Sequence, residues 1–189
     1  MFKWMKDNYG SLLHKVAWFD NIISFHQAWN TIPHSKVHQV LYDANKKTFK
    51  VFKDENGKDF LVTVLMLFQT KIQPQSEDKT NKGFFRIDIG KNRDWETLQK
   101  IWETLVLDCV TGNIPGLDSG AEEGVTGVRF IQKSNFNHLN TFRVEIWVKG
   151  SSDTSGVNKE LRAYLQKNII KDVLKEPDNS GPNIEFSSL

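Results

Sequence analysis

The chain has 189 residues, a length that suits a single domain over residues 1–189 with a sizeable core. Its formal net charge of +2 excludes a protein that coats nucleic acid through a strong overall field, so any phosphate binding must come from a local cluster of cations. The single cysteine, Cys109, excludes an internal disulfide and fits a reducing compartment. Residues 1–7 contain no apolar secretion segment, and the longest apolar run, residues 60–68, is too short to cross a membrane; we expect a soluble cytoplasmic protein.

The N-terminal part of the chain predicts strands followed by a helix. Residues 1–19 alternate loosely between polar and apolar types, which indicates one or two strands. Asp20 is expected to cap a helix over residues 21–30, because the apolar side chains there recur at helical spacing. Pro33 would stop that helix.

A hairpin and a further strand come next. Residues 48–53 and 59–69 are expected to form strands joined by a tight turn at residues 54–57, where Asn-Gly is a strong turn signal. Residues 71–83 form a polar loop. The alternation over residues 84–89 predicts a strand with one apolar and one polar face.

The clearest helix of the chain begins after Asn92 or Asp94, either of which can cap it, and ends at Gly112. Its apolar side chains recur on one side, which indicates that this side is buried. We expect Cys109 to be an inert buried thiol on that stripe. The stripe consists of Trp95, Leu98, Ile101, Trp102, Leu105 and Cys109.

Residues 124–131 and 142–148 predict the central hairpin, two β-branched strands that flank a polar loop. Arg129 lies at the end of the first strand, and Trp147 lies near the end of the second. A hairpin that carries cations and a large aromatic side chain can seat a planar group with an anionic tail. The other candidate cations in or beside the loop are Lys133, His138 and Arg143.

A third helix is expected to begin at Asp153 or Thr154 and to run to Pro177, followed by a short last strand at residues 182–186. The order of strands and amphipathic helices favours an α+β domain. Its helices would cover one face of the sheet and leave the other face for a ligand.

Taken together, these segments resemble the translation initiation factor 4E family of messenger-RNA cap-binding proteins. The matching stretches run with interruptions from Tyr9 to Phe186, and the most specific run is residues 83–147. It comprises a glycine before an aromatic strand, Leu98-x-x-Ile101-Trp102 in the helix, Val128-Arg129 and Ile146-Trp147. The first helix with its Phe19-Asp20 start, the third helix with residues 159–162 and the closing residues 181–184 match as well.

The resemblance implies a curved antiparallel sheet of about eight strands, with three helices on its convex face and a cap-binding slot on the concave face. The hairpin region, about residues 34–71, departs from the family pattern as an insertion. Together with the altered slot residues, this indicates a divergent member of the kind found among protists, some of which meet hypermethylated caps.

The chemistry of the slot follows from the ligand. Methylation at N7 makes the guanine cationic, so aromatic faces attract it by stacking and by cation–π interaction. One carboxylate can accept both the N1–H and the N2 amino group as a charge-assisted pair. The triphosphate requires Arg and Lys side chains at fixed points.

The residues that carry these roles in the family are only partly retained. The first stacking position falls on Tyr9, and the second falls on Ser76, which has no aromatic ring; Phe68, Phe84 or Phe85 could take its place. The carboxylate position is kept as Glu77. The remaining positions are Trp147 at the N7-methyl group and Arg129, Lys133, Arg143 and Lys82 at the phosphates.

The family also binds a helical Tyr-x-x-x-x-Leu motif of a scaffold or repressor protein on its convex face. The partner-binding positions correspond to Ile22, His26 and Leu107. His26 stands where the family has a Trp, so we expect the choice of partner to differ.

Other interpretations of the same residues remain open. Tyr9 can be a turn aromatic, Glu77 a solvated carboxylate, Trp147 a core side chain and Arg129 a surface cation. The protein could also act mainly as a protein-interaction or translation-repressing module with weak cap affinity. An enzyme using Glu77, Asp88 or a His is disfavoured, because the sequence has no phosphate-binding glycine loop or nucleophile elbow. We expect no cofactor and no metal, since the His residues lack the spacing of metal ligands, and we expect no membrane partner.

Overall fold

The computed structural model of the protein describes residues 17–31, 36–43, 48–90, 93–117, 124–133, 141–151, 156–176 and 181–189. The chain forms two compact units, Met1–Ser35 and Lys36–Leu189. None of the helices in these described ranges has the length and apolar character needed to cross a bilayer.

The first unit contains helix α2, Ile22–Thr31, which confirms the helix expected over residues 21–30. Its cap is Asn21 and not Asp20, because the Asn21 side chain accepts a hydrogen bond of 2.9 Å from the backbone N–H of Ser24. Phe25 is buried, and its ring packs against the ring of Phe19, with the two centroids 5.1 Å apart. The strands expected over residues 1–19 fall almost wholly outside the described residues.

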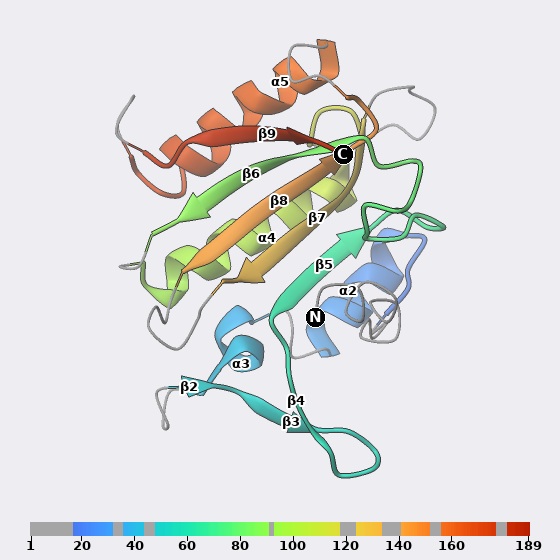
Figure 1. Ribbon diagram of the computed structural model, residues 1–189, viewed down its shortest axis with the longest axis vertical. Helices are drawn as coiled ribbons and strands as arrows, with labels where there is room; N and C mark the ends of the chain where they lie inside the picture. The colour runs from blue at the N-terminus through green and yellow to red at the C-terminus, as the bar shows by residue number, and fades with distance from the viewer. Residues whose placement is uncertain are drawn as a thin grey trace. The chain divides into compact units, whose positions relative to one another are not determined.

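The second unit is built on an antiparallel sheet of five strands in the order β5-β7-β8-β6-β9 (Figure 1). The central hairpin expected from the sequence is present as β7 paired with β8, and β8 in turn pairs with β6. The five strands are β5 Val64–Phe68, β6 Gly83–Ile89, β7 Val125–Gln132, β8 Phe142–Val148 and β9 Ile184–Ser188.

Two long helices cover one face of this sheet: α4, Trp95–Thr111, and α5, Gly156–Tyr164, which continues as a π-helical segment over Leu165–Lys171. Asp94 caps α4, as expected, by accepting a hydrogen bond of 2.7 Å from the backbone N–H of Thr97. The start expected for the third helix, residues 153–154, lies outside the described residues.

The core lies between α4, α5 and the sheet. Trp102 of α4 packs edge-on against Phe130 of β7, and Arg162 of α5 lies over the ring of Phe85 of β6. The stripe expected on α4 is buried apart from Trp95, which is half-buried. Burial raises the pKa of the Cys109 thiol to about 12, which agrees with an inert thiol.

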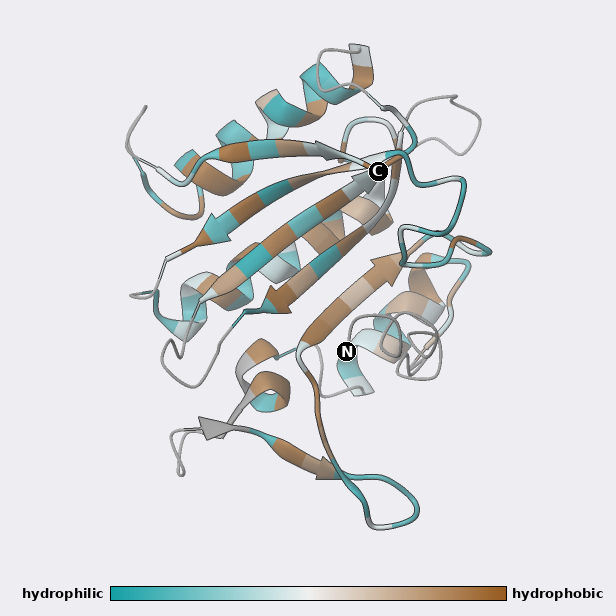
Figure 2. Ribbon diagram, viewed as in Figure 1, coloured by the Kyte–Doolittle hydropathy of each residue, from teal (hydrophilic) through white to brown (hydrophobic). Residues whose placement is uncertain are grey.

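Alternation along β6 separates this core from the opposite face of the sheet. Phe85, Ile87 and Ile89 of β6 are buried beneath the helices, whereas the residues between them point to the other side. Figure 2 shows the same alternation of hydrophobic and hydrophilic bands along β6 and β8. The charged side chains of β6 and β8 lie on the face opposite the helices, which leaves that face available for polar chemistry.

The region between residues 36 and 61 has its own small elements, and two strand pairs stand apart from the main sheet: β1 with β2 and β3 with β4. The turn of the β3–β4 hairpin matches the Asn-Gly expectation, because Gly57 has a φ of 77° that favours glycine. Asp54 fixes this turn by accepting the backbone N–H groups of Asn56 and Lys58, both at 2.9 Å. The elements are α3 Val37–Leu41, β1 Tyr42–Asp43, β2 Thr48–Phe49, β3 Val51–Lys53 and β4 Asp59–Leu61.

The α+β class and the antiparallel sheet agree with the expectation, but the counts differ. Within the described residues the main sheet has five strands and not about eight. The described helices are α2, α3, α4 and α5, one more than the three expected. The strand expected over residues 59–69 is interrupted at Val62 and Thr63, which divide it into β4 and β5.

Candidate functional site

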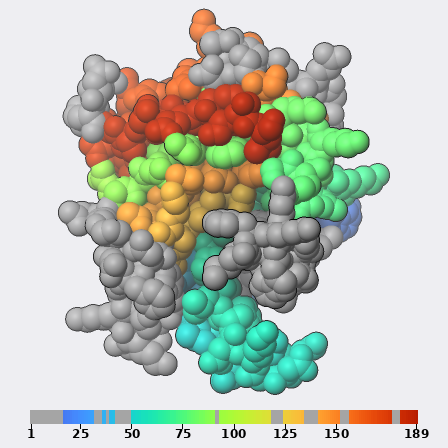
Figure 3. Space-filling view, viewed as in Figure 1, coloured from blue at the N-terminus to red at the C-terminus, as the bar shows by residue number. Residues whose placement is uncertain are grey.

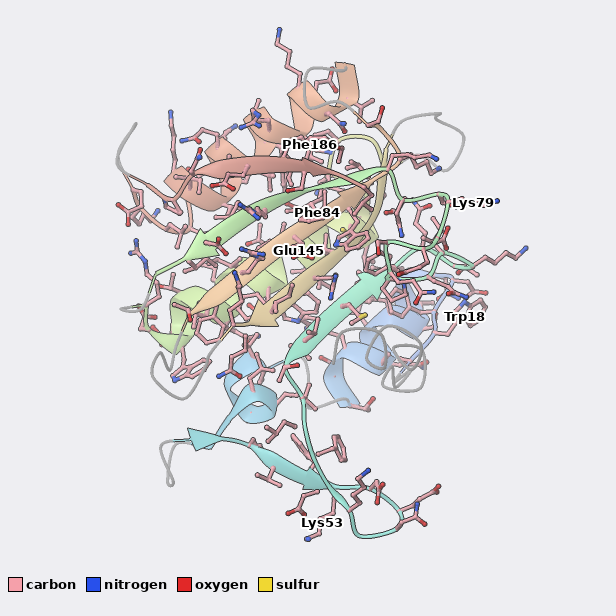
Figure 4. All side chains as sticks on the ribbon, in the orientation of Figure 1. Trp18, Lys53, Lys79, Phe84, Glu145 and Phe186 are labelled. Carbon is pink, nitrogen blue, oxygen red and sulfur yellow. The ribbon has the colours of Figure 1, made fainter. Side chains whose placement is uncertain are left out.

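The face of the five-stranded sheet that points away from α4 and α5, here called the open face, gathers most of the candidate ligand-binding side chains. Figure 3 shows atoms of β6, β8 and β9 at this surface, and Figure 4 labels Phe84 and Glu145 on it. The register brings its members together from all five strands of the sheet. They are Met66, Phe68, Phe84, Arg86, Asp88, Arg129, Arg143, Glu145, Trp147 and Glu185.

One end of the open face is aromatic. Phe84 stacks on Trp147 with the ring centroids 5.2 Å apart and the ring planes at 19°, while Phe68 meets Trp147 edge-on at 6.0 Å. Gly127 allows Phe68 to approach, since a Cβ there would lie only 2.4 Å from the phenyl ring. Trp147 is 4% exposed, whereas Phe68 and Phe84 are half-buried. The two phenylalanines, and not the tryptophan, therefore present ring surface to solvent.

Glu145 joins this aromatic end to the cations. The indole Nε1–H of Trp147 donates to Glu145 Oε2 at 3.0 Å, and the guanidinium of Arg129 donates to the same oxygen at 3.2 Å. Arg129 also lies over the Trp147 ring, 5.2 Å from its centroid. Trp147 is thus held by a stacked phenyl ring, a cation and a carboxylate, which fixes its orientation.

The middle of the open face is a chain of ion pairs. Arg143 and Asp88 form a bidentate pair with hydrogen bonds of 2.7 and 2.8 Å. Arg143 also lies 3.9 Å from Glu145, and Lys133 lies 3.9 Å from Asp88. The hydrogen bond from Arg143 holds the pKa of the Asp88 carboxyl below its ordinary value of 3.8.

A further pair extends this chain toward the edge of the sheet, where Arg86 donates to Glu185 across β6 and β9. Each of the three arginines of the open face, Arg86, Arg129 and Arg143, therefore contacts a carboxylate of the protein itself. A phosphate that binds here must compete with those carboxylates for the guanidinium groups.

The loop between β5 and β6, residues 69–82, is hydrogen-bonded to the sheet at both ends, through Gln69 and Lys82, and between them by one buried amide. Asn81 is 3% exposed; its Nδ2 donates to the carbonyl groups of Gln73 and Gln75 at 2.9 and 3.0 Å. Its Oδ1 accepts the hydroxyl of Thr126, a buried residue of β7, at 2.8 Å. Asp78 accepts the backbone N–H groups of Gln73 and Thr80 inside the loop, and these hydrogen bonds lower its pKa. The loop consequently has a defined shape.

Ser76 and Glu77 are exposed in this loop, and the Ser76 hydroxyl donates to Glu77 Oε2 at 3.1 Å. The loop starts directly after Phe68 and ends directly before Gly83 and Phe84. Because Phe68 and Phe84 both contact Trp147, the two ends of the loop meet at the aromatic end of the open face. An exposed carboxylate therefore belongs to the loop that borders a partly exposed aromatic surface.

The structure brings some predicted site residues together and leaves others apart. Trp147, Arg129 and Arg143 are on the open face, and Lys133 reaches its ion-pair chain. Lys82 is exposed next to β6. Tyr9 and His138 lie outside the described residues.

The residues expected to bind a partner protein lie on helices. Ile22 and His26 are exposed on α2 of the first unit, with Ile22 48% exposed. Leu107 is 38% exposed on α4 of the second unit.

Three important residues were missed or left undecided by sequence reasoning. Phe84 was one of three aromatic candidates, and Phe85 is excluded because its ring is buried on the helix face. Glu145 was not singled out, although its alternation with Arg143 and Trp147 would place all three on one face. The role of Asn81 could not be predicted from the sequence. Two of its partners are backbone carbonyl groups, and the third, Thr126, is far away along the chain.

A cavity of about 570 Å³ lies at the edge strand β5, beside the aromatic end. The lining residues described for it carry no charge, so it does not suit an anionic nucleotide by itself. They are Leu67, Phe68, Gln69, Thr70, Cys109, Val110, Leu117, Thr126 and Gly127. In the described part of the chain no group of three or more His, Cys, Asp or Glu side chains is placed to hold a metal ion.

Comparison with known proteins identifies a protein family that matches this chain. The model of the family described as eukaryotic initiation factor 4E matches residues 2–188. A search of curated proteins found no match. Among solved structures, C. elegans eIF4E-3 in complex with the 4E-binding protein Mextli is similar, with 16% identity, a TM-score of 0.58, and coverage of 94% of this chain and 82% of that one. The same protein with Mextli and a cap analog gives 16% identity, a TM-score of 0.55, and coverage of 94% and 80%.

Proposed function

Because the chain belongs to the eukaryotic initiation factor 4E family, we propose that it binds the 7-methylguanosine cap of messenger RNA and brings the message to translation initiation through a scaffold protein. We propose that the base binds at the aromatic end of the open face and that the phosphates extend along its ion-pair chain. The protein acts by binding and not by catalysis.

One observation carries this proposal: the loop that holds Glu77 begins and ends on the two phenylalanines that pack against Trp147. A cationic, planar base needs an aromatic face and a carboxylate at its edge. The aromatic end and its loop supply both chemistries, and the adjacent guanidinium groups suit a triphosphate.

The residue roles follow from this placement. Glu77 accepts the N1–H and the N2 amino group of the base, and Trp147 supports the site beneath the N7-methyl group. Lys133 and Lys82 are the more exposed phosphate-binding cations, and Arg129 and Arg143 contribute when a phosphate displaces their carboxylate partners. The assignments of Tyr9 and Ser76 to the base-binding site stay predictions from the sequence.

Affinity chromatography tests the proposal. The full chain is passed over immobilised 7-methylguanosine triphosphate and eluted first with GTP and then with the methylated nucleotide. We expect retention, poor elution by GTP and sharp elution by the methylated nucleotide. Equal elution by both nucleotides, or no retention, would contradict a methyl-specific site.

A scaffold or repressor with a helical Tyr-x-x-x-x-Leu motif is the proposed protein partner. The Mextli complexes of C. elegans eIF4E-3 show that a related fold accepts a 4E-binding protein. The roles of Ile22, His26 and Leu107 stay predictions, and Leu107→Arg should weaken capture of the motif peptide without changing cap retention. Unchanged capture of the peptide would show that Leu107 is not part of the partner-binding surface.

A second candidate function is a protein-interaction or translation-repressing module with weak cap affinity. It is favoured by Ser76 at an expected aromatic position and by the carboxylates that occupy the three arginines of the open face. Isothermal titration separates the two functions. If the chain binds the motif peptide but gives no measurable heat with the cap analogue, the protein-interaction module is the correct function.

A further inference from the structure

The aromatic end of the open face contains two stacked rings whose inner member is inaccessible. Trp147 is 4% exposed, with Phe84 parallel to its ring at 5.2 Å and the Arg129 guanidinium at 5.2 Å from the ring centroid. Its indole N–H is already bonded to Glu145. A base therefore cannot slide onto Trp147 without displacing a group that packs on it.

Phe84 differs from Trp147 in the way its ring is held. It points to the open face from β6, directly opposite Trp147 in the β6–β8 register. The ring is half-buried, so one side packs on Trp147 while part of its surface remains accessible. The parallel packing presents a flat and rigid surface, and a rigid aromatic surface loses little conformational entropy when a base stacks on it.

The surroundings of Phe84 suit a planar cation with an anionic tail. Gly83, the preceding residue, follows directly on the loop that carries Glu77, while Arg86 follows two residues later on the same face. Along the chain, the Glu77 carboxylate therefore precedes the Phe84 ring, and the Arg86 guanidinium, which pairs with Glu185, follows it. Phe68 bounds the other edge of the Trp147 ring.

We propose that Phe84, stacked on Trp147, is the surface on which the methylated base stacks, and that it supplies the aromatic contact that Ser76 does not. This inference rests on the proposed function and specifies how the same site recognises its ligand. A phenyl ring attracts a cation less strongly than an indole does. The preference for methylated over plain nucleotide should therefore depend on the ring at position 84.

Isothermal titration of the full chain with 7-methylguanosine triphosphate and with GTP tests the inference. Phe84→Leu keeps an apolar side chain on Trp147 but removes the aromatic face, so the affinity for the methylated nucleotide should fall about tenfold or more. The affinity for GTP should fall less. The matched control is Phe52→Leu, which alters a phenylalanine that is also ring-stacked, on Phe60 of the β3–β4 hairpin, and should leave both affinities unchanged.

A second variant reports contact directly and keeps the test valid if Phe84→Leu fails to fold. In Phe84→Trp, 7-methylguanosine triphosphate should quench more of the tryptophan emission than it does in the unaltered chain, and the methylated-to-plain preference should rise. If the unaltered chain binds the methylated nucleotide but Phe84→Leu binds it within twofold, or if Phe84→Trp adds no quenching, the role of Phe84 is overturned. If the unaltered chain does not bind the methylated nucleotide at all, the proposed function fails together with this inference.

Discussion

At the scale of single residues, the open face is a place where the protein's own carboxylates occupy its cations. Glu145 is the clearest case, because one buried carboxylate contacts the Trp147 indole and two guanidinium groups. Its side chain is 7% exposed. Such a group stabilises the folded chain and at the same time reduces the positive potential that a phosphate would meet.

Glu145→Gln should therefore tighten binding of the nucleotide triphosphate. The amide can still accept the Trp147 indole hydrogen bond, but it no longer neutralises Arg129 and Arg143. We expect the affinity for 7-methylguanosine triphosphate to rise about fivefold and the affinity for the monophosphate to change little. The free energy of unfolding, measured in urea, should fall by about 1–3 kcal/mol. If the affinities for the monophosphate and the triphosphate rose equally, the phosphates would not extend along the ion-pair chain that includes Glu145.

Glu77→Gln tests the carboxylate assigned to the base edge. Replacing the carboxylate by an amide removes the charge-assisted pair and presents a donor to the N1–H or the N2 amino group, so binding should nearly disappear. The control is Glu55→Gln, an exposed carboxylate in the turn of the β3–β4 hairpin. Isothermal titration that finds full affinity in Glu77→Gln would remove this loop from the site.

At the scale of elements, the loop between β5 and β6 owes its shape to Asn81. The buried amide satisfies two loop carbonyl groups and a hydroxyl of β7, so it connects the loop to the sheet. Residues 73–77 have few other anchors to the strands among the described contacts. The conformation of the loop that carries Glu77 therefore depends on Asn81, a residue outside the proposed base-binding set.

Asn81→Ala should loosen this loop. It leaves the carbonyl groups of Gln73 and Gln75 and the hydroxyl of Thr126 without their partner, at a cost of about 1–3 kcal/mol in the free energy of unfolding. Cap affinity should fall as well, because Glu77 is no longer positioned. Unfolding in urea and titration with the methylated nucleotide measure the two effects. A variant with reduced stability but full affinity would show that the loop does not position Glu77.

Most of the helices and strands could be predicted from the sequence, but the side-chain contacts between them could not. Periodicity reports which side of an element is buried, so the helix over residues 95–111 and the hairpin around Arg129 and Trp147 could be predicted. Periodicity says nothing about register between distant strands. For that reason the stacking of Phe84 on Trp147 and the pairing of Arg143 with Asp88 emerged only from the structure. The break of the strand at Val62 and Thr63 was missed because both residue types favour strands.

At the scale of the whole molecule, the ion pairs of the open face make stability depend on pH. The pKa of Asp88 is lowered below its ordinary value of 3.8, chiefly by the hydrogen bond from Arg143. A carboxyl whose pKa is lower in the folded chain than in the unfolded chain adds stability above the unfolded pKa. That contribution is lost as the pH falls through the folded value.

The free energy of unfolding should accordingly decrease as the pH is lowered below about 4. Asp88→Asn should be less stable at neutral pH, by no more than about 1 kcal/mol because the pair is partly exposed. Its stability should also fall less steeply in acid. Urea unfolding at a series of pH values measures both slopes. Parallel slopes for the variant and the unaltered chain would mean that Asp88 is not a source of the acid sensitivity.

The proposed binding site for the methylated nucleotide is the aromatic end of the open face. Hydrogen exchange of the full chain, with and without 7-methylguanosine triphosphate, shows which backbone N–H groups the nucleotide protects. We predict slower exchange of the backbone N–H groups in the 69–82 loop and at the start of β6, and no change in the β3–β4 hairpin. Protection confined to other parts of the chain, with the loop and β6 unchanged, would contradict binding at the aromatic end.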